Sequence, residues 1–157
     1  MMGARGMMDV RPACPADIPR LLTLIRQYWD VEGISGFKAL RIELVLKQLL
    51  AGAAAPAMIW VAESESALLG YLIAVLVLSV EHQGLMGEID EFFVLPQARS
   101  RGTGKQLLAA AEAALLQRGC LRVQLQLRRE NHRARAFYDR HGYASRAGYE
   151  LLDKPLA

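Results

Sequence analysis

The sequence predicts a single domain of the α/β class. Strand-like and helix-like segments alternate along the 157 residues of the chain, and this alternation is typical of sheets that are covered by helices. Apolar residues make up 53% of the chain and charged residues 22%, which are the proportions of a globular protein with one hydrophobic core. Because no repeat, low-complexity tract or linker interrupts the pattern, we expect one domain over residues 9–157.

The N-terminus and the apolar segments indicate where the protein works. Residues 1–8 are expected to form a disordered extension, and the opening stretch lacks the apolar core of a signal peptide. No segment approaches the roughly 20 apolar residues that a membrane helix requires. We therefore expect a cytoplasmic protein without a membrane partner. His82 and His132 have no partners at metal-ligand spacing, so we expect no metal site.

The first third of the domain predicts a short strand and two helices. Residues 9–13 form the expected strand, and Asp17 is expected to cap a helix that runs to about residue 31. Gly33 and Gly36 break this helix, and a second helix is expected over residues 38–50. Four leucines of the second helix are available to the core: Leu40, Leu44, Leu46 and Leu50.

The middle of the chain predicts three strands. Residues 58–63 and 68–78 are apolar runs on either side of a polar turn, which predicts an antiparallel hairpin. After a loop over residues 81–87, another strand is expected over residues 88–94, and Pro96 ends it.

The last third alternates again between helices and strands. Residues 102–118 carry an apolar stripe and predict a helix, with Gly119 as its C-terminal cap. Apolar and polar residues alternate over residues 121–128, which predicts a half-buried strand. A final helix is expected over residues 131–141, and residues 143–152 can supply one or two closing strands.

The segment V94-L-P-Q-A-R-S-R-G-T-G-K105 joins a buried strand to a helix that opens with Gly102 and Gly104. Free N–H groups and the positive end of the helix dipole make such a turn a phosphate site. Three basic side chains surround it: Arg99, Arg101 and Lys105. A Walker A loop is excluded because Gln106 follows the lysine, and a dinucleotide-binding turn because Leu107 replaces its third glycine. The alternative is a plain turn with solvated arginines.

The last predicted helix carries a second motif. Asn131 and Tyr138 are two helical turns apart, so they share a face and can reach one extended ligand. The alternative is an amphipathic helix whose core side is formed by Ala134, Phe137 and His141. Arginines are frequent here, but few aromatic residues are interleaved with them, so we expect no nucleic-acid partner.

In this order and spacing, the two motifs resemble the GCN5-related N-acetyltransferase (GNAT) family over residues 9–152, most sharply over residues 88–143. The resemblance implies a single-domain fold with a mixed, mostly antiparallel sheet of six to seven strands, splayed at its centre and flanked by about four helices. It also implies direct transfer of the acetyl group of acetyl-CoA to a primary amine. A homodimer, formed through the C-terminal strands, is a further expectation.

The resemblance also assigns roles to residues. The loop would bind the coenzyme A pyrophosphate, Asn131 would contact the coenzyme, and Tyr138 would protonate the departing thiolate. The strand before the loop would hold the pantetheine arm and the acetyl oxygen through backbone hydrogen bonds. The expected coenzyme residues of strand and loop are Phe92, Phe93, Val94, Arg99, Ser100, Arg101, Gly102, Thr103, Gly104 and Lys105.

Three carboxylates crowd that strand: Glu88, Asp90 and Glu91. Strict alternation places Glu88 and Asp90 on one face and Glu91 on the other, but a bulge, usual in the family, would shift this parity. Glu88 matches the catalytic glutamate of histone acetyltransferases, and the other two match the acidic pair of polyamine acetyltransferases. We hypothesise that Asp90 and Glu91 bind or deprotonate the amine. Solvated strand-end charges are the alternative for all three.

The acceptor amine is the least specified part of the prediction. Tyr28, Trp29, Glu32 and Phe37 lie where such folds usually recognise substrates, although at least one of the first two is expected in the core. A small-molecule amine, with polyamines or diamines as the first guess, is the leading hypothesis. A protein lysine or N-terminal amine is the alternative substrate. A coenzyme A-binding module without catalysis is the alternative of another class.

Overall fold

The computed structural model describes residues 7–52 and 55–156 and divides into two compact units, Met1–Leu125 and Gln126–Ala157. The first unit contains the sheet and three α-helices, and the second contains the last helix. Of the expected N-terminal extension, residues 1–6 lie outside the described residues, and Met7 and Met8 directly precede the first strand.

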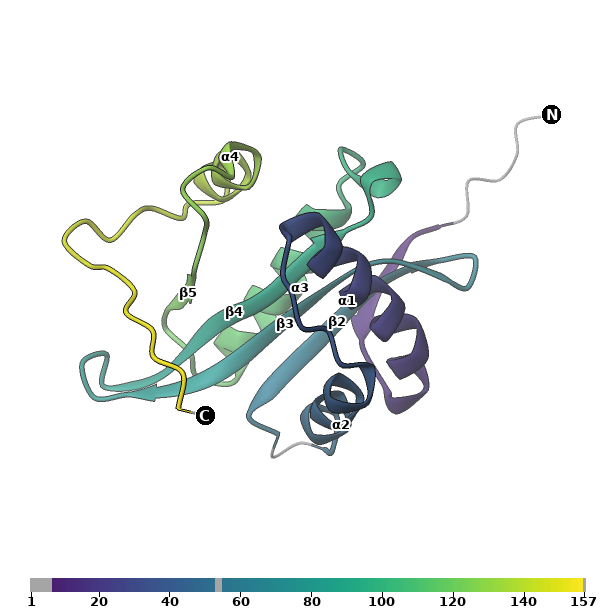
Figure 1. The fold of residues 1–157 in the computed structure, drawn as a ribbon. Coiled ribbons are helices and arrows are strands. Elements are labelled where there is room, and N and C mark those ends of the chain that lie inside the picture. The colour runs from purple at the N-terminus through teal and green to yellow at the C-terminus, as the bar shows by residue number, and fades with distance from the viewer. Residues whose placement is uncertain (1–6, 53–54, 157) are drawn as a thin grey trace. The chain divides into compact units, whose positions relative to one another are not determined.

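A mixed sheet of five strands, in the order β1-β2-β3-β4-β5, forms the centre of the first unit (Figure 1). Neighbouring strands are antiparallel from β1 to β4, and β5 pairs with β4 in parallel. The strands are β1 (Asp9–Pro12), β2 (Ala57–Ser64), β3 (Ala67–Ser79), β4 (Gly84–Val94) and β5 (Val123–Leu125).

The expectation of six to seven strands is wrong, because the described residues form five. Of the strand expected over residues 121–128, only β5 pairs with β4, and Leu121 is 86% exposed. Residues 143–152 form no strand. Their small and polar residues do not alternate with apolar ones, and Gly148 takes a left-handed backbone with a φ of 89°.

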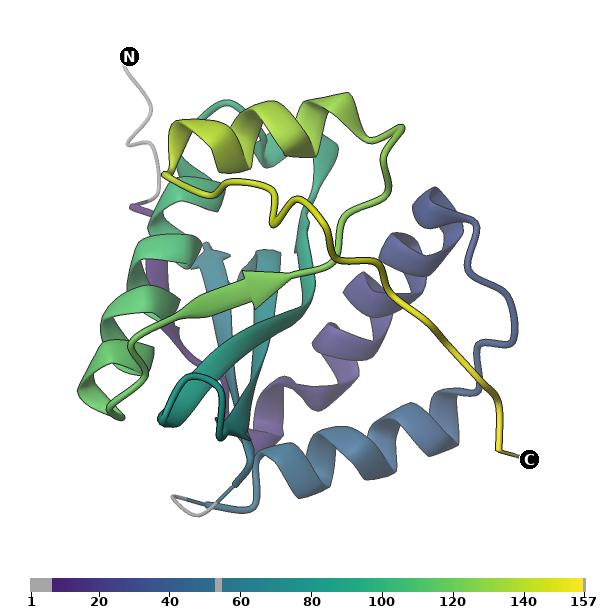
Figure 2. The ribbon, with the colours of Figure 1, turned by 90° about the vertical axis from the view of Figure 1, so that its left-hand side faces the viewer.

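Helices cover both faces of the sheet (Figure 2). Helices α1 (Ile18–Glu32) and α2 (Ala39–Leu49) lie on one face, and α3 (Thr103–Gln117) lies on the other. Short 3-10 turns, η1 (Pro15–Asp17) and η2 (Pro96–Ala98), precede α1 and α3. Helix α1 ends at Glu32, and Gly33, which was expected to break the helix, caps it with a left-handed backbone (φ 66°).

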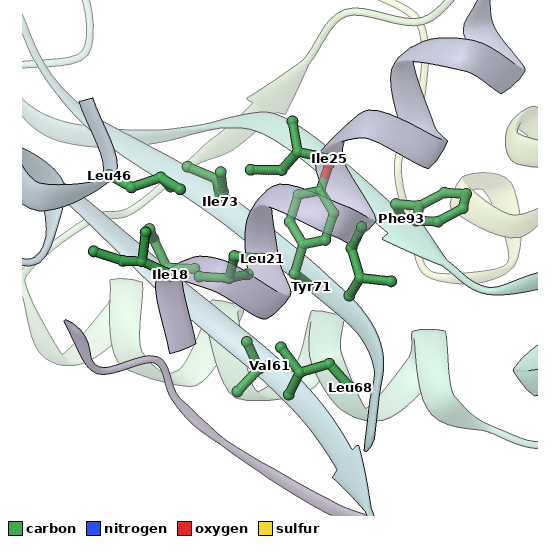
Figure 3. Packing of buried hydrophobic residues seen from close by; sticks show 11 residues of the cluster. Ile18, Leu21, Ile25, Leu46, Val61, Leu68, Tyr71, Ile73 and Phe93 are labelled. Atoms are coloured by element: carbon green, nitrogen blue, oxygen red, sulfur yellow. The ribbon is translucent and has the colours of Figure 1, made fainter. Parts of the chain in front are cut away.

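The main core lies between α1 and the sheet (Figure 3). Leu21 of α1 and Tyr71 of β3 are both fully buried, and the Tyr71 ring lies among Ile25, Ile73 and Phe93. Burial of side chains of this size stabilises the fold by about 1.5–3 kcal/mol each. This core therefore fixes α1 against β3 and β4, the elements that carry the candidate site.

Asp17 is the N-cap residue of α1, as expected, but its side chain has another role. Asp17 lies at the N-terminus of α1, but its carboxylate forms no cap hydrogen bond with that helix. Instead it accepts a hydrogen bond from the Cys14 N–H and pairs with the guanidinium groups of Arg11 and Arg20. The same two arginines bind Glu63 of β2, so the four charges tie β1, η1, α1 and β2 together.

The core side of α2 differs from the expectation. Leu46 is buried, whereas Leu40 is 77% and Leu44 60% exposed. The physical reason is helical geometry, because residues two apart in a helix point about 200° away from each other. Leu44 and Leu46 cannot both face the core, and the helix buries Leu46 together with its neighbours at that face: Ile42, Leu49 and Leu50.

The second unit contains α4 (His132–Arg140) and the segment that follows it. The Asn131 side chain caps this helix by accepting a hydrogen bond of 3.1 Å from the Ala134 N–H. Tyr138 is buried and makes edge contacts with the rings of Phe137 and Tyr143, at centroid distances of 5.4 and 5.3 Å.

Candidate active site

Strand β4 contains a bulge at Asp90. Ile73 of β3 pairs with Glu91 and the next residue, Ala74, pairs with Ile89, so that Asp90 is an extra residue. A bulge of one residue reverses the face on which the following side chains lie. The parity from strict alternation, which separated Glu88 from Glu91, is therefore wrong.

Glu88 and Glu91 lie on the face of the sheet that α1 covers. A Cβ at Gly87 would lie 2.7 Å from Leu115 of α3, so Gly87 faces α3 and its neighbour Glu88 faces the opposite side. Glu91 contacts α1 directly, because Trp29 Nε1 donates a hydrogen bond of 2.9 Å to Glu91 Oε1.

Two neutral donors hold the Glu91 carboxylate. In addition to Trp29, the Tyr71 hydroxyl donates to Glu91 Oε2 over 2.8 Å. Burial raises the pKa of Glu91 above its ordinary value. The two hydrogen bonds oppose this rise, and the negative charge of Asp90 adds to it. Burial and the Glu91 charge also raise the pKa of Tyr71, which therefore stays a hydroxyl.

The other two carboxylates have different surroundings. Glu88 Oε2 accepts a hydrogen bond of 2.7 Å from Gln124 Nε2 of β5. The pKa of Asp90 is raised, first because nearby protein desolvates its carboxyl and second because Glu88 repels its charge. Within the described part of the chain, no lysine or arginine forms an ion pair with Glu88, Asp90 or Glu91. The bulge thus carries a local cluster of uncompensated negative charge.

Among the described residues, no strand pairs with the C-terminal half of β4 on the side opposite β3. Pairing with β5 ends at Ile89, which lies opposite Leu125, whereas pairing with β3 continues to Val94. The Leu95 N–H donates to the Leu69 carbonyl of β3. Since hydrogen-bonding directions alternate along an antiparallel strand, the N–H and C=O groups of Phe92 and Val94 point away from β3. This is the backbone edge that the sequence associates with the pantetheine arm.

The loop between β4 and α3 has the backbone of an anion site. Ser100 and Gly102 both have left-handed backbones, with φ values of 61° and 84°. Such conformations turn consecutive N–H groups into one concavity, and the first N–H groups of α3 have no partner within the helix. Thr103 stabilises this turn, because its buried hydroxyl donates over 3.0 Å to the Ala98 carbonyl. The donor set fits a pyrophosphate.

The three basic side chains of the loop differ in their positions. Arg99 Nε donates over 2.8 Å to the Val94 carbonyl, and its guanidinium lies 5.7 Å from the centre of the Phe93 ring. Arg99 therefore fixes the end of β4 to the loop. Arg101 and Lys105 are exposed and available to an anion at the start of α3.

The aromatic residues of α1 combine core packing with the site. Tyr28 lies against Phe93 with ring centroids 5.9 Å apart, and both Tyr28 and Trp29 are partly buried against the main core. Trp29 also makes an edge contact with Phe37 at 5.5 Å. Trp29, a candidate substrate residue, is thus joined to a β4 carboxylate, and Glu32 is half-exposed.

Tyr71 and Gln124 contact the carboxylates but were not expected there. A tyrosine within the otherwise aliphatic run of residues 68–78 is the signal that points to Tyr71. Gln124 lies on the polar side of an alternating strand and gives no comparable signal. Asn131 and Tyr138 belong to the second unit, where Asn131 caps α4 and Tyr138 is buried.

Two properties of the described residues bear on other classes of site. No group of three or more His, Cys, Asp or Glu side chains in the described part of the chain is arranged to hold a metal ion. No helix among those residues is long and apolar enough to span a membrane. The expected cytoplasmic location and homodimer stay predictions.

The chain has relatives of known sequence. Residues 20–143 match the model of the Acetyltransferase (GNAT) family. The uncharacterised N-acetyltransferase YhfO of Bacillus subtilis is 26% identical over 149 residues, which cover 90% of this chain and 93% of that protein. A match to the aminoalkylphosphonate N-acetyltransferase of Salmonella typhimurium is 39% identical over 64 residues, or 41% of this chain and 42% of that enzyme.

Solved structures share the fold. An integron cassette protein from the metagenome of Cole Harbour Salt Marsh has a TM-score of 0.82 at 27% identity, with 94% of this chain and 90% of that chain covered. The aminoglycoside acetyltransferase AAC(6')-Iy, in complex with a bisubstrate analogue, has a TM-score of 0.81 at 20% identity, with 95% and 99% covered. Because the family model spans most of the chain, this protein belongs to the GNAT family and is an N-acetyltransferase that uses acetyl-CoA.

Proposed function

We propose that this enzyme acetylates a primary amine of a small molecule that carries more than one positive charge, with polyamines and diamines as the first class to test. The observation that carries the proposal is the uncompensated cluster of Glu88, Asp90 and Glu91 at the bulge of β4. Clustered carboxylates attract cations and raise their local concentration. An acceptor with a phosphonate group would be repelled by the same charges.

The carboxylates also suit the proton transfer that the reaction requires. A primary amine has a pKa near 10 in water, so it must lose a proton before it attacks a carbonyl. A carboxylate removes this proton directly or through water. Asp90 is the best-placed acceptor, because its raised pKa brings its basicity closer to neutral pH and no described side chain donates to it.

The acetyl donor would be held by backbone groups. Acetyl-CoA supplies the acetyl group as a thioester. We assign its pyrophosphate to the loop from Ser100 to Gly104, supported by Arg101 and Lys105, and its pantetheine arm to the edge of β4 at Phe92 and Val94, on the side opposite β3. An N–H group on that edge can donate to the carbonyl oxygen as negative charge develops there. Tyr138 is the proposed proton donor to the sulfur, and Asn131 remains a proposed coenzyme contact through its backbone, since its side chain caps α4.

Aminoglycosides are a second candidate class of acceptor. Two aminoglycoside acetyltransferases, AAC(6')-Iy and the soil-metagenome enzyme meta-AAC0020, share the fold at TM-scores of 0.81 and 0.80. Their acceptors carry several amines, so they too would be attracted to the β4 carboxylates. The charge cluster alone does not distinguish the two classes.

The test is release of free coenzyme A thiol from acetyl-CoA with polyamines, diamines, aminoglycosides, amino acids and peptides as acceptors. We expect turnover with one class of small polycationic amine, and a large loss of turnover in Tyr138→Phe. A protein with acceptor-independent release only, or with peptides as its sole acceptors, would contradict the proposal. In the latter case the acceptor is a protein lysine or N-terminal amine.

A further inference from the structure

Glu91 is fixed by side chains from two different elements. Trp29 of α1 donates to Oε1 and Tyr71 of β3 donates to Oε2. Both donors are themselves held in place, because Tyr71 is 0% exposed within the main core and Trp29 makes an edge contact with Phe37. The orientation of the carboxylate therefore depends on how α1 packs on the sheet.

The chemistry of this arrangement is clear from a comparison with Glu63. Arg11 and Arg20 bind the two carboxylate oxygens of Glu63, so its charge is neutralised. The donors to Glu91 are an indole and a phenol, which carry no charge. Each oxygen of a carboxylate has two lone pairs, so each oxygen of Glu91 can accept one more hydrogen bond. Glu91 thus keeps both its negative charge and its capacity to bind a donor.

We propose that Trp29 and Tyr71 are positioning residues that hold Glu91 as a fixed, ionised carboxylate for an ammonium group of the acceptor, while another β4 carboxylate accepts the reacting proton. The inference deepens the proposed function and rests on it for the class of acceptor. A base must change its hydrogen bonds as it gains a proton, and the two donors oppose this at Glu91. Asp90 has no such donors among the described residues.

The donors act on ionisation in a direction that can be measured. Hydrogen bonds to a carboxylate favour its charged form, so each of them lowers the pKa of Glu91 against the effect of burial. The other titratable groups that act on this pair are Asp90 on β4 and Tyr28 on α1. Removal of the Tyr71 hydroxyl should therefore raise the pKa of Glu91, by about one pH unit for a hydrogen bond to a charged group.

Tryptophan fluorescence gives a direct readout, because the chain has 2 tryptophans and only Trp29 contacts Glu91. Trp60 is buried in β2, and its replacement by Phe leaves Trp29 as the sole tryptophan. In Trp60→Phe, we expect the tryptophan emission to titrate with Glu91, with a midpoint above the ordinary pKa of a glutamate. The midpoint should rise by about one unit in Trp60→Phe/Tyr71→Phe, and the transition should vanish in Trp60→Phe/Glu91→Gln.

A transition that persists after Glu91→Gln, or a midpoint that Tyr71→Phe does not move, would overturn the positioning role. Glu65→Gln is the matched control, since it removes one carboxylate from the exposed turn between β2 and β3 and should leave the midpoint in place. Circular dichroism and thermal melts confirm that each variant is folded. If Tyr71→Phe fails to fold, an NMR titration of Glu91 in Trp29→Phe measures the effect of the other donor on the pKa of Glu91.

Calorimetric titration with spermidine tests the acceptor side without any turnover. We expect Glu91→Gln to weaken spermidine binding by at least about tenfold, and Trp29→Phe by less. Glu65→Gln should bind as the wild type does. Equal affinity in the wild type and Glu91→Gln would overturn the assignment of Glu91 to the acceptor. Binding that depends on Glu91, in a protein without transferase activity, would support this inference and contradict the proposed function instead.

Discussion

Gly70 of β3 lies directly against the backbone of Phe93 in β4. A Cβ at Gly70 would come within 2.6 Å of the Phe93 carbonyl oxygen and 3.2 Å of the Val94 Cα. These atoms belong to the part of β4 that pairs with β3 but with no described strand on its other side. The close approach of the two strands at Gly70 therefore sets the position of the proposed coenzyme edge.

Gly70→Ala should displace the end of β4, because a backbone carbonyl cannot rotate away from the new methyl group. We expect a loss of about 2–3 kcal/mol in the free energy of unfolding, as is typical of overpacking, and weaker binding of coenzyme A. Denaturant unfolding and calorimetry measure the two effects. Gly87→Ala, on β4 itself, is the matched control, since the nearest atoms to its methyl group belong to the side chain of Leu115 and not to the backbone. Gly87→Ala with the same loss of coenzyme affinity would contradict this account.

Gly102→Ala tests the loop at the start of α3. Gly102 and Gly119 have nearly equal left-handed φ values, 84° and 87°, and a Cβ would meet no close atom at either. Alanine should therefore cost a similar free energy of unfolding at both positions, about 1 kcal/mol. Only Gly102→Ala should weaken coenzyme A binding, because only that turn presents N–H groups to an anion. Equal affinities in the two variants would remove the loop from the proposed coenzyme site.

The backbone of the proposed coenzyme loop is the part of the candidate site that the sequence predicts best, for a physical reason. Its signals are local: Pro96, Gly102 and Gly104 lie within a few residues of each other and decide the turn by their own backbone preferences. Boundaries of β2, β3, β4 and α3 agree with the expected ranges within a few residues, because long apolar runs and stripes specify them.

The acceptor side could not be predicted in the same way. Trp29 and Glu91 are 62 positions apart and Tyr71 and Glu91 are 20 apart, so their contacts depend on the packing of α1 on β3 and β4. The bulge at Asp90 has no sequence signal of its own, yet it decides on which face Glu91 lies. The number of strands was overestimated because it was taken from what is usual in the family. Residues 143–152 of this chain lack the alternation that a strand requires.

Glu88→Gln should shift the pH dependence of turnover. Glu88 raises the pKa of Asp90 by charge repulsion, in addition to the larger effect of desolvation. If Asp90 accepts the amine proton, kcat falls as Asp90 becomes protonated, and the acidic limb lies above the ordinary pKa of an aspartate. Removal of the Glu88 charge should move this limb to lower pH by a fraction of a unit. Asp90→Asn should lower kcat at every pH by about 10²-fold or more. A limb that Asp90→Asn leaves unchanged would exclude Asp90 as the proton acceptor.

Asp17 should dominate the acid stability of the fold. Its carboxylate is fully buried, and the Arg11 guanidinium lowers its pKa far below the ordinary value of 3.8. A lowered pKa contributes stability that is complete above the unfolded pKa and is lost as the pH falls below it. The wild type should therefore lose stability below about pH 4, whereas Asp17→Asn should lack this part of the pH dependence.

At pH 7, Asp17→Asn should lower the free energy of unfolding by about 3 kcal/mol, because two arginines then share Glu63 alone. The exposed pair Arg26–Asp30 provides the control, and Asp30→Asn should change stability by less than about 0.5 kcal/mol. Equal losses in the two variants, measured by urea unfolding between pH 3 and 7, would show that the Arg11–Asp17 pair does not stabilise the junction of β1, α1 and β2.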